Sequence, residues 1–364
     1  MAMFRGVLIG SSSTALLCTL GFYTYSHSIQ QAATTRPASS PLDLQGTSYH
    51  VTSDEQAVRQ RGSEILKYGI PDRGPMVSYY ANHVLSYDQA KRTPLWVAEH
   101  IQPHHVKGSA DRKRTNFNPD PAVPTMFSAT NDDYRKSGWS RGHMAPAADN
   151  KHDQIAMEET FYLTNILPQD MDNNSGFWNR LELYCRDLTK RFTDVRIISG
   201  PLWLPREQNG KNMVTYQVLG KNNVAVPTHL FKVILVEGAS GGSHQALSAF
   251  VVPNEPISKH QQLKDFLVPL EHLEKVVGFR FHPQLNRALL NNLCKVDECR
   301  LASADDLELY YIRKNLGAAS STKQLDSVWK ELERKKLKPD KQLMDMYNKK
   351  RQQLLQNAER KSEL

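Results

Sequence analysis

The sequence predicts an α+β fold in a chain of 364 residues. Short apolar and β-branched runs separated by turn residues fill its central part, and one amphipathic helical pattern interrupts them. The last part, residues 302–364, is instead rich in Lys, Glu and Gln with helical spacing. With 40% hydrophobic residues the chain can bury a large core in one or two domains, which excludes disorder throughout.

The net charge favours polyanionic partners. Lys and Arg number 46 against 38 Asp and Glu, a formal charge of +8. A surplus of this size suits nucleic acid or an acidic membrane surface, and charge alone does not choose between them.

The N-terminal sequence predicts a membrane anchor or an organellar targeting segment. Residues 6–26 carry no charge, follow Arg5 and approach the ~20 residues that span a bilayer. The flanks contain arginine and hydroxyl residues with no acid before Asp43, as in organellar targeting sequences. We therefore expect residues 1–45 to be a targeting or membrane-anchor segment with a linker, and the protein to lie at the mitochondrial inner membrane. A cleaved secretory signal is the alternative.

The globular body is predicted within residues 46–301 and begins near Leu66. Its expected strands are Met76–Tyr80, Thr93–His100, Val195–Ser199, Val214–Leu219, His229–Val236 and Leu247–Val252. A helix is expected over Ser175–Lys190, because Trp178, Leu181, Cys185 and Leu188 recur on one face.

Residues 302–364 predict a separate helical module with two amphipathic helices on either side of Pro339. Leu325, Val328, Trp329 and Leu332 share one face of the first. The module also carries the basic residues Lys335, Lys336, Lys338, Lys349, Lys350 and Arg351, which form either a solvated face or a barrier beside a substrate.

Cysteine usage supports neither a disulfide framework nor a zinc finger. The four cysteines are Cys18, Cys185, Cys294 and Cys299, and the last two have no neighbouring His or Cys to complete a tetrahedral site. We expect reduced thiols.

Chemically useful side chains are densest between Ser140 and Arg186. Arg141 and His143 lie two apart, so on an extended segment both side chains share a face. A guanidinium can bind phosphate while an imidazole takes a proton from water, although a His after Gly is also an ordinary turn residue.

The following helix carries three more candidates. Asn174 is either the N-cap of the helix or a neutral oxygen ligand of the kind that suits Mg²⁺. Glu182 and Arg186 are spaced i,i+4, which a surface salt bridge explains as well as a role in catalysis.

Taken together, the pattern R-G-H, then T-N-x-x-P-Q, then N-x-G-x-W-x-R-L-E resembles the DNA/RNA non-specific endonuclease family. The resemblance implies a mixed or antiparallel sheet core with a ββα-metal finger as active site, and PTHLFKVIL (227–235) is similar to a later core strand of that family. The N-terminal apolar segment, the C-terminal extension and SRGH in place of DRGH are similar to its mitochondrial exo/endonucleases.

The resemblance also implies roles for single residues. His143 matches the general base, Asn174 the direct Mg²⁺ ligand and Glu182 a carboxylate that holds metal-bound water. Arg141 and Arg186 match arginines that face the phosphate. Asn165 and Gln169 match positions in the supporting, substrate-binding strand. An upstream arginine is also expected, for which we favour Arg112 over Arg114. Ser140 departs from the usual Asp, which should alter how the finger is braced.

The function implied is Mg²⁺-dependent hydrolysis of DNA and RNA, with Mn²⁺ as a substitute and little sequence preference. The products would carry 5′-phosphate and 3′-hydroxyl ends. Within this family the resemblance implies 5′–3′ exonuclease and endonuclease activity, preferably on single strands or 5′ ends, by a homodimer that serves mitochondrial DNA repair. The alternatives are a catalytically silent nucleic-acid binder, a secreted or vesicular scavenging nuclease, and a small-molecule phosphodiesterase or phosphatase.

Overall fold

The computed structural model describes residues 60–61, 77–239 and 242–362. The targeting segment 1–45, Cys18 and the expected domain start near Leu66 lie outside the described residues. Contacts divide the chain into two units, one of residues 75–205 with 214–364 and one that groups the segment 206–213 with the N-terminal residues. In the described part, no helix is long and apolar enough to cross a membrane.

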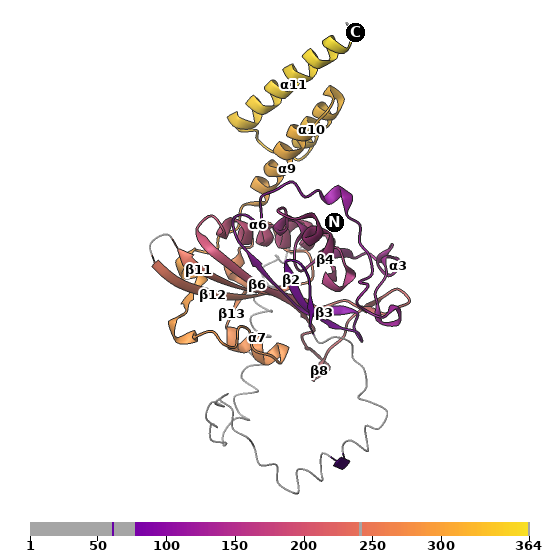
Figure 1. Cartoon of the computed structure of the whole chain (residues 1–364), viewed down its shortest axis with the longest axis vertical. Coiled ribbons are helices and arrows are strands. Elements are labelled where there is room, and N and C mark those ends of the chain that lie inside the picture. Colours follow the sequence, from indigo (N-terminus) through magenta and orange to yellow (C-terminus); the bar gives the residue numbers. More distant parts are fainter. Residues whose placement is uncertain (1–59, 62–76, 240–241, 363–364) are drawn as a thin grey trace, which may run out of the picture. The chain divides into compact units, whose positions relative to one another are not determined.

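The predicted α+β fold is confirmed, and one large sheet forms its core (Figure 1). The order of its strands is β1-β2-β3-β6-β11-β12-β13, antiparallel throughout, with β14 pairing parallel to β12. The bounds are β1 Ser78–Tyr79, β2 His83–Asp88, β3 Thr93–Ile101, β6 Phe192–Leu202, β11 His229–Ala239, β12 Gly242–Pro253, β13 Leu267–Val268 and β14 Asn291–Asn292.

Helix α6 (Asn179–Leu188) covers one face of this sheet, and α7 (Leu270–Val277) lies on the opposite side (Figure 1). The predicted apolar helix face is confirmed, since Leu181, Cys185 and Leu188 are buried in the main core. Alternate residues of β11 serve the two faces. Leu230 and Ile234 join the α6 side, whereas Phe231 packs edge-on against Phe281.

One expected strand is shorter in the structure, and one strand was not expected. Of Val214–Leu219, only Val218–Leu219 (β9) pairs, with β10 (Val224–Ala225). The sequence pattern missed β2, whose buried positions include the polar residues His83 and Ser86 and which contains a register shift at Ser86/Tyr87.

A short hairpin and a helix build the ββα unit. Strand β4 (Ser140–His143) pairs antiparallel with β5 (Ile166–Gln169), and α5 (Met171–Asn173), the π-helical turn η5 (Asn174–Trp178) and α6 follow without a break. The shorter helices α3 (Asn131–Tyr134), α4 (Gln154–Glu159), η1 (Arg112–Arg114), η2 (Thr125–Phe127), η3 (Ala147–Asp149) and η4 (Leu163–Asn165) lie in the connections before it.

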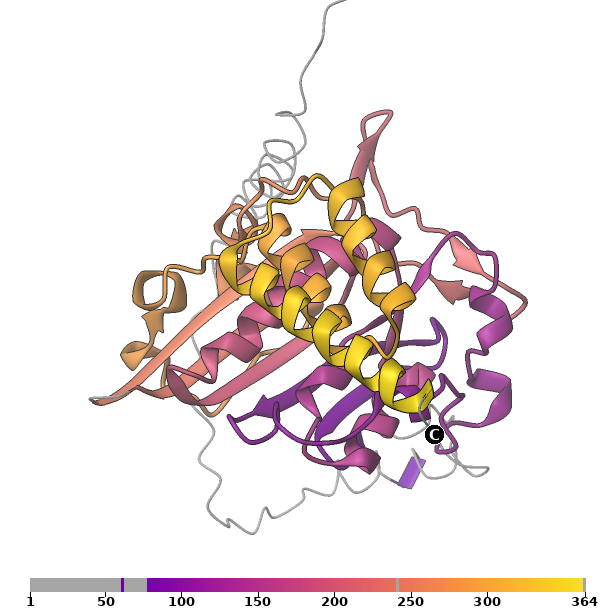
Figure 2. The ribbon, with the colours of Figure 1, turned by 90° about the horizontal axis from the view of Figure 1, so that it is seen from above.

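Three helices, not the expected two, form the C-terminal module: α9 (Ala304–Ala318), α10 (Thr322–Arg334) and α11 (Lys341–Ser362) (Figure 2). Pro339 lies between α10 and α11, as expected, and α9 is the helix that the pattern missed. The predicted apolar face is confirmed, because Leu325 and Leu332 are buried and Val328 and Trp329 pack against them.

The prediction of reduced thiols is wrong for one pair. Cys294, inside α8 (Leu293–Val296), and Cys299, in the turn after it, form a disulfide. Glu298 and Cys299 both adopt positive φ, which folds the chain back and brings the two Cα atoms to 4.7 Å. Cys185 is free and buried, as expected.

Four remaining short elements complete the described chain. The strands β7 (Arg206–Gln208) and β8 (Lys211–Met213) form an exposed two-stranded hairpin. The others are the single turns η6 (Leu263–Phe266) and η7 (Arg287–Leu289).

Candidate active site

His143 ends β4 in a pocket of aromatic rings. Its ring centroid lies 5.2 Å from that of Phe117 and 4.8 Å from that of Phe161, and the residue is 8% exposed. Burial, followed by the charges of Arg112 and Arg141, lowers the pKa of His143 to about 3. The imidazole is therefore neutral at physiological pH, the form that can accept a proton.

The two ring nitrogens of His143 differ in environment. Nε2 is buried and has no hydrogen-bond partner among the described residues. Because that atom is enclosed, Nδ1 is the nitrogen left to receive a proton from a water molecule.

The glycine of R-G-H is required by a close approach from β5. A Cβ at Gly142 would lie 2.1 Å from Oε1 of Gln169, a fully buried side chain. The Ser140 hydroxyl donates to the Gln169 carbonyl at 2.7 Å, across the register of the two strands. The residue that departs from the family pattern therefore braces the hairpin through a bond that a carboxylate could not donate.

Asn165 is a brace for the same hairpin. Its side chain accepts the Ala145 N–H at 2.9 Å and donates to the carbonyls of Ala145 and Thr160 at 2.9 and 2.8 Å. The residue is fully buried. These contacts engage its amide with the backbone, so Asn165 orients the segment after His143 and does not reach a substrate.

Asn174 lies inside a helix, so the N-cap interpretation is wrong. The helix begins at Met171, where Asp170 is the N-cap and accepts the Asn173 N–H at 2.8 Å. Asn174 is helical, half-buried, and the first residue of the π turn. Its side chain makes no hydrogen bond to any described residue, which leaves the amide oxygen for a ligand.

The π turn changes which residues share a helix face. Eight residues of regular α-helix, at about 100° each, would separate Asn174 and Glu182 by roughly 80° around the axis. The extra residue taken up by a π bulge reduces this to about 20°. The bulge thus brings the candidate ligand and the candidate carboxylate onto one face.

Glu182 and Arg186 do not pair with each other in the described structure. Arg186 Nη1 donates to Asp149 Oδ1 at 2.6 Å, with Asp149 buried, so the expected salt-bridge alternative is not formed. Burial raises the pKa of Glu182 to about 7, against the nearby charges of Arg186 and Lys232. Its carboxylate makes no hydrogen bond within the described residues.

Two further arginines flank His143. The Arg141 guanidinium lies 4.4 Å from the Phe117 ring and donates to Asn131 Oδ1 at 2.5 Å. Arg112 lies over the Phe161 ring at 5.6 Å, and its charge lowers the pKa of both His143 and Glu182. This electrostatic coupling to two site residues favours Arg112 over Arg114.

A layer of buried charged residues lies beneath α6, and the sequence did not predict it. Glu99 on β3 and Lys232 on β11 are buried, and Lys232 donates to Ser199 at 2.7 Å. Burial, with the negative charge of Asp149, raises the pKa of Glu99 well above its usual value. Lys232 lies within PTHLFKVIL and Asp149 lies six residues after R-G-H, but neither residue type indicates a role there without the tertiary contacts.

The donors present fit a hard divalent cation. The half-buried Asn174 amide oxygen and the Glu182 carboxylate lack protein partners in the described structure, and both supply oxygen, which Mg²⁺ prefers while keeping several waters. Among the described residues there is no group of three His, Cys, Asp or Glu that could hold a metal ion.

Comparisons with known proteins agree with this geometry. The sequence matches the DNA/RNA non-specific endonuclease family over residues 61–288. It is 52% identical over 289 residues to the mitochondrial nuclease EXOG of Xenopus laevis, covering 79% of this chain and 81% of that protein. Human mitochondrial nuclease EXOG is 49% identical over 291 residues, 79% of each chain.

The similarity extends to endonuclease G. Human mitochondrial endonuclease G is 44% identical over 223 residues, 61% of this chain and 74% of that protein. A crystal structure of EndoG in complex with EndoGI is 41% identical with a TM-score of 0.58, covering 64% of this chain and 95% of that one. The expected resemblance, including that to the mitochondrial exo/endonucleases, is confirmed. The chain belongs to the DNA/RNA non-specific endonuclease family.

Proposed function

We propose that this chain hydrolyses phosphodiester bonds of DNA and RNA in a Mg²⁺-dependent reaction in which Mn²⁺ can replace Mg²⁺. The observation that carries the proposal is His143, a buried neutral imidazole with a free Nδ1 beside the charges of Arg112 and Arg141. A neutral base next to cations is the arrangement that deprotonates water while binding a phosphate.

Each residue has one task in this mechanism. His143 takes the proton from the attacking water, and Arg141, Arg186 and Arg112 hold the phosphate and offset its growing negative charge. Asn174 would hold the metal directly and Glu182 through a water molecule. When bound, Mg²⁺ supplies positive charge to the phosphate and the leaving oxygen. The products carry 5′-phosphate and 3′-hydroxyl ends.

These contacts read no bases, so little sequence preference is expected. Preference for strand ends requires a barrier, and we propose that helix α9 contributes to one. The Tyr311 hydroxyl and the Asn179 amide hydrogen-bond at 2.8 Å, five residues from Asn174. A cavity of about 380 Å³ between the π turn and α9 is lined by both residues. We propose that the module restricts long strands and favours 5′–3′ exonuclease action over internal cuts.

The names of the relatives support a cellular setting. They are mitochondrial nucleases, and we propose that this chain acts in mitochondrial DNA repair, as a homodimer at the inner membrane through residues 1–45. Fractionation of tagged full-length protein tests the compartment, and light scattering of the purified chain tests the homodimer. A secreted product or a monomer would overturn the respective proposal.

The decisive experiment uses the full chain with Mg²⁺ and 5′- or 3′-labelled single-stranded, duplex and RNA–DNA hybrid oligonucleotides. His143→Ala should lower turnover ~10²-fold or more, because the general base is lost. His260→Ala, a substitution in an exposed loop, is the matched control. Small products from the 5′ end establish exonuclease action, scattered products indicate endonuclease action, and near-normal turnover by His143→Ala would remove the assignment of the base.

A further inference from the structure

Four histidines gather around the loop that leads into Arg112, with His104 and His105 on the loop, His100 on β3 and His152 on the segment after Asp149. The ring centroids of His104 and His105 are 4.0 Å apart, those of His105 and His152 are 4.5 Å apart, and His100 lies 6.3 Å from His105. Burial and the charges of the other three lower the pKa of His105 to about 4. The central ring is therefore neutral at physiological pH and presents an aromatic surface.

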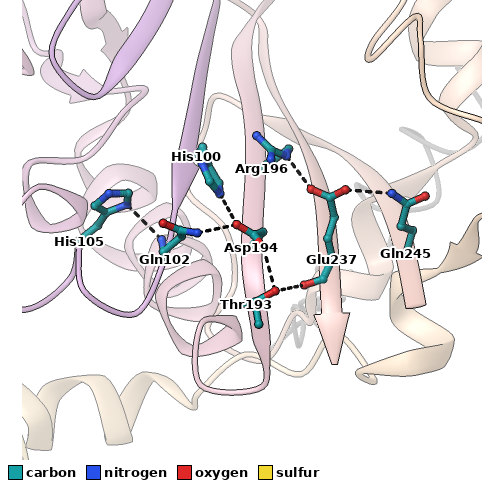
Figure 3. Close-up of polar contacts among 8 residues, drawn as sticks. All are labelled: His100, Gln102, His105, Thr193, Asp194, Arg196, Glu237 and Gln245. Carbon is teal, nitrogen blue, oxygen red and sulfur yellow. Dashed lines mark hydrogen bonds and ion pairs between the residues drawn. The ribbon is translucent and has the colours of Figure 1, made fainter. Parts of the chain in front are cut away.

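The start of this loop is fixed to the large sheet. Asp194 on β6 is hydrogen-bonded to His100 Nε2 and to Gln102 Nε2, each at 2.7 Å, and Gln102 donates its backbone N–H to His105 Nδ1 (Figure 3). The histidines thus stand on a rigid base.

The middle and end of the loop are fastened to the segment after Asp149. The His105 carbonyl accepts the N–H groups of Lys151 and His152 at 2.9 and 3.3 Å. Gly108 has φ +143 and lies so close that a Cβ there would be 2.1 Å from the Lys151 carbonyl oxygen. The loop and this segment form one preorganised surface.

That surface adjoins the candidate active site on two sides. The loop ends in Arg112, whose charge acts on His143 and Glu182. On the other side, His152 lies three residues after Asp149, which forms an ion pair with Arg186. Two of the proposed phosphate-binding arginines therefore border the cluster.

The outward side chains suit a single nucleic-acid strand. We call His104, His105, Lys107, Lys151 and His152 the imidazole surface. His104, Lys107 and His152 are exposed, and His105 and Lys151 are half-buried. Nearby carboxylates are engaged locally, since Asp153 accepts the Ala156 N–H at 2.7 Å and Asp111 accepts the Lys113 N–H at 2.9 Å. Cations that contact phosphates beside rings that stack on bases are the features of single-strand binding sites, whereas a duplex offers no free base faces.

We propose that the imidazole surface binds the single-stranded DNA or RNA that flanks the cleaved phosphodiester. This inference rests on the proposed nuclease function and adds where the remainder of the strand lies. Binding here raises affinity for long strands without changing the chemistry at His143.

The first test is the salt dependence of binding by the full chain in EDTA, measured by fluorescence anisotropy with a 16-nucleotide single strand. Replacing Lys107 and Lys151 by Ser should weaken binding and reduce the slope of log affinity against log salt by about 1.4, for two lost phosphate contacts. Lys264→Ser with Lys275→Ser removes the same charge elsewhere, from exposed positions, and should leave the slope unchanged.

The second test separates stacking from charge. Replacing His104 and His152 by Ala should lower affinity about fivefold or more for each lost base stack, at an unchanged salt slope. With Mg²⁺, the Lys107/Lys151 and His104/His152 double variants should cut a tetranucleotide as fast as the unaltered chain does. At low substrate concentration they should cut the 16-mer more slowly than the unaltered chain. If the unaltered chain cuts nothing, the nuclease proposal fails. Suppose instead that the unaltered chain cuts, but that both double variants bind the single strand as the Lys264/Lys275 control does, or lose affinity for a blunt duplex equally. The proposed role of the imidazole surface is then wrong, and the nuclease proposal stands.

Discussion

At the residue scale, His143 owes its chemistry to the rings of Phe117 and Phe161 that enclose it. An exposed imidazole titrates near neutral pH, whereas this one holds no proton until strongly acid conditions. The neighbouring Gly142 has no room for a side chain, because Gln169 packs directly against it.

Two glycines should therefore respond oppositely to alanine. Gly142→Ala forces the buried Gln169 side chain to move and should lower the free energy of unfolding by about 1–3 kcal/mol. Gly176→Ala, in the π turn with open space at its Cβ position, should raise it by up to about 1 kcal/mol. Urea unfolding of both variants measures the difference, and equal effects would contradict this account of R-G-H.

Glu182 should make the metal-free protein less stable as pH rises. Burial raises its pKa from 4.5 to about 7, so the folded state holds an extra proton between these values and stability falls as pH increases through them. Each pKa unit corresponds to about 1.4 kcal/mol, which the partial exposure of Glu182 reduces to on the order of 2 kcal/mol in total.

Thermal unfolding in EDTA from pH 4.5 to 8 measures this effect. Glu182→Gln should flatten the decline, whereas Glu333→Gln, an exposed position on α10, should retain it. If the stability of Glu182→Gln falls with pH as steeply as that of the unaltered chain, another group causes the fall, and Glu99 is the next candidate.

At the element scale, the π turn η5 sets the register between Asn174 and Glu182. A π bulge accommodates one more residue than an α turn, and such bulges occur often at functional sites. Trp178, which ends the turn, and Leu181 and Cys185 of α6 are buried in the main core.

Deleting Gly176 tests this role. The helix should become regular, and the seven residues that then separate Asn174 from Glu182, at about 100° each, should keep the two within about 20° around the axis. We expect helical circular dichroism, turnover and the Mg²⁺ titration to be retained, whereas Asn174→Ala should lower activity and alter the titration. A loss of activity in the deletion variant as large as in Asn174→Ala would contradict a role of the bulge that is limited to this register.

At the scale of the whole molecule, the C-terminal helices meet the nuclease core beside the candidate site. Arg180 is buried and donates from Nε to the Ala302 carbonyl at 2.7 Å, while Tyr311 bonds to Asn179. The module is therefore attached at the helix that carries Asn174.

Loosening that attachment should change the products. Tyr311→Phe removes the hydrogen bonds to Asn179 and should raise the share of internal cuts relative to release from the 5′ end. Tyr310→Phe is the control, since that neighbouring side chain is exposed and has no hydrogen bond among the described residues. Identical product patterns on end-labelled oligonucleotides would exclude the module as the source of end preference.

The sequence by itself determined the family, the α+β class and the residue types of the candidate site, because motif spacing and apolar periodicity are local properties of the chain. Tertiary structure decided what those residues do. It placed Asn174 in a π turn, paired Arg186 with Asp149 rather than Glu182, and joined Cys294 to Cys299. It also made His143 neutral. Burial, partner choice and pKa depend on atoms brought together from distant segments, and no local pattern records those contacts.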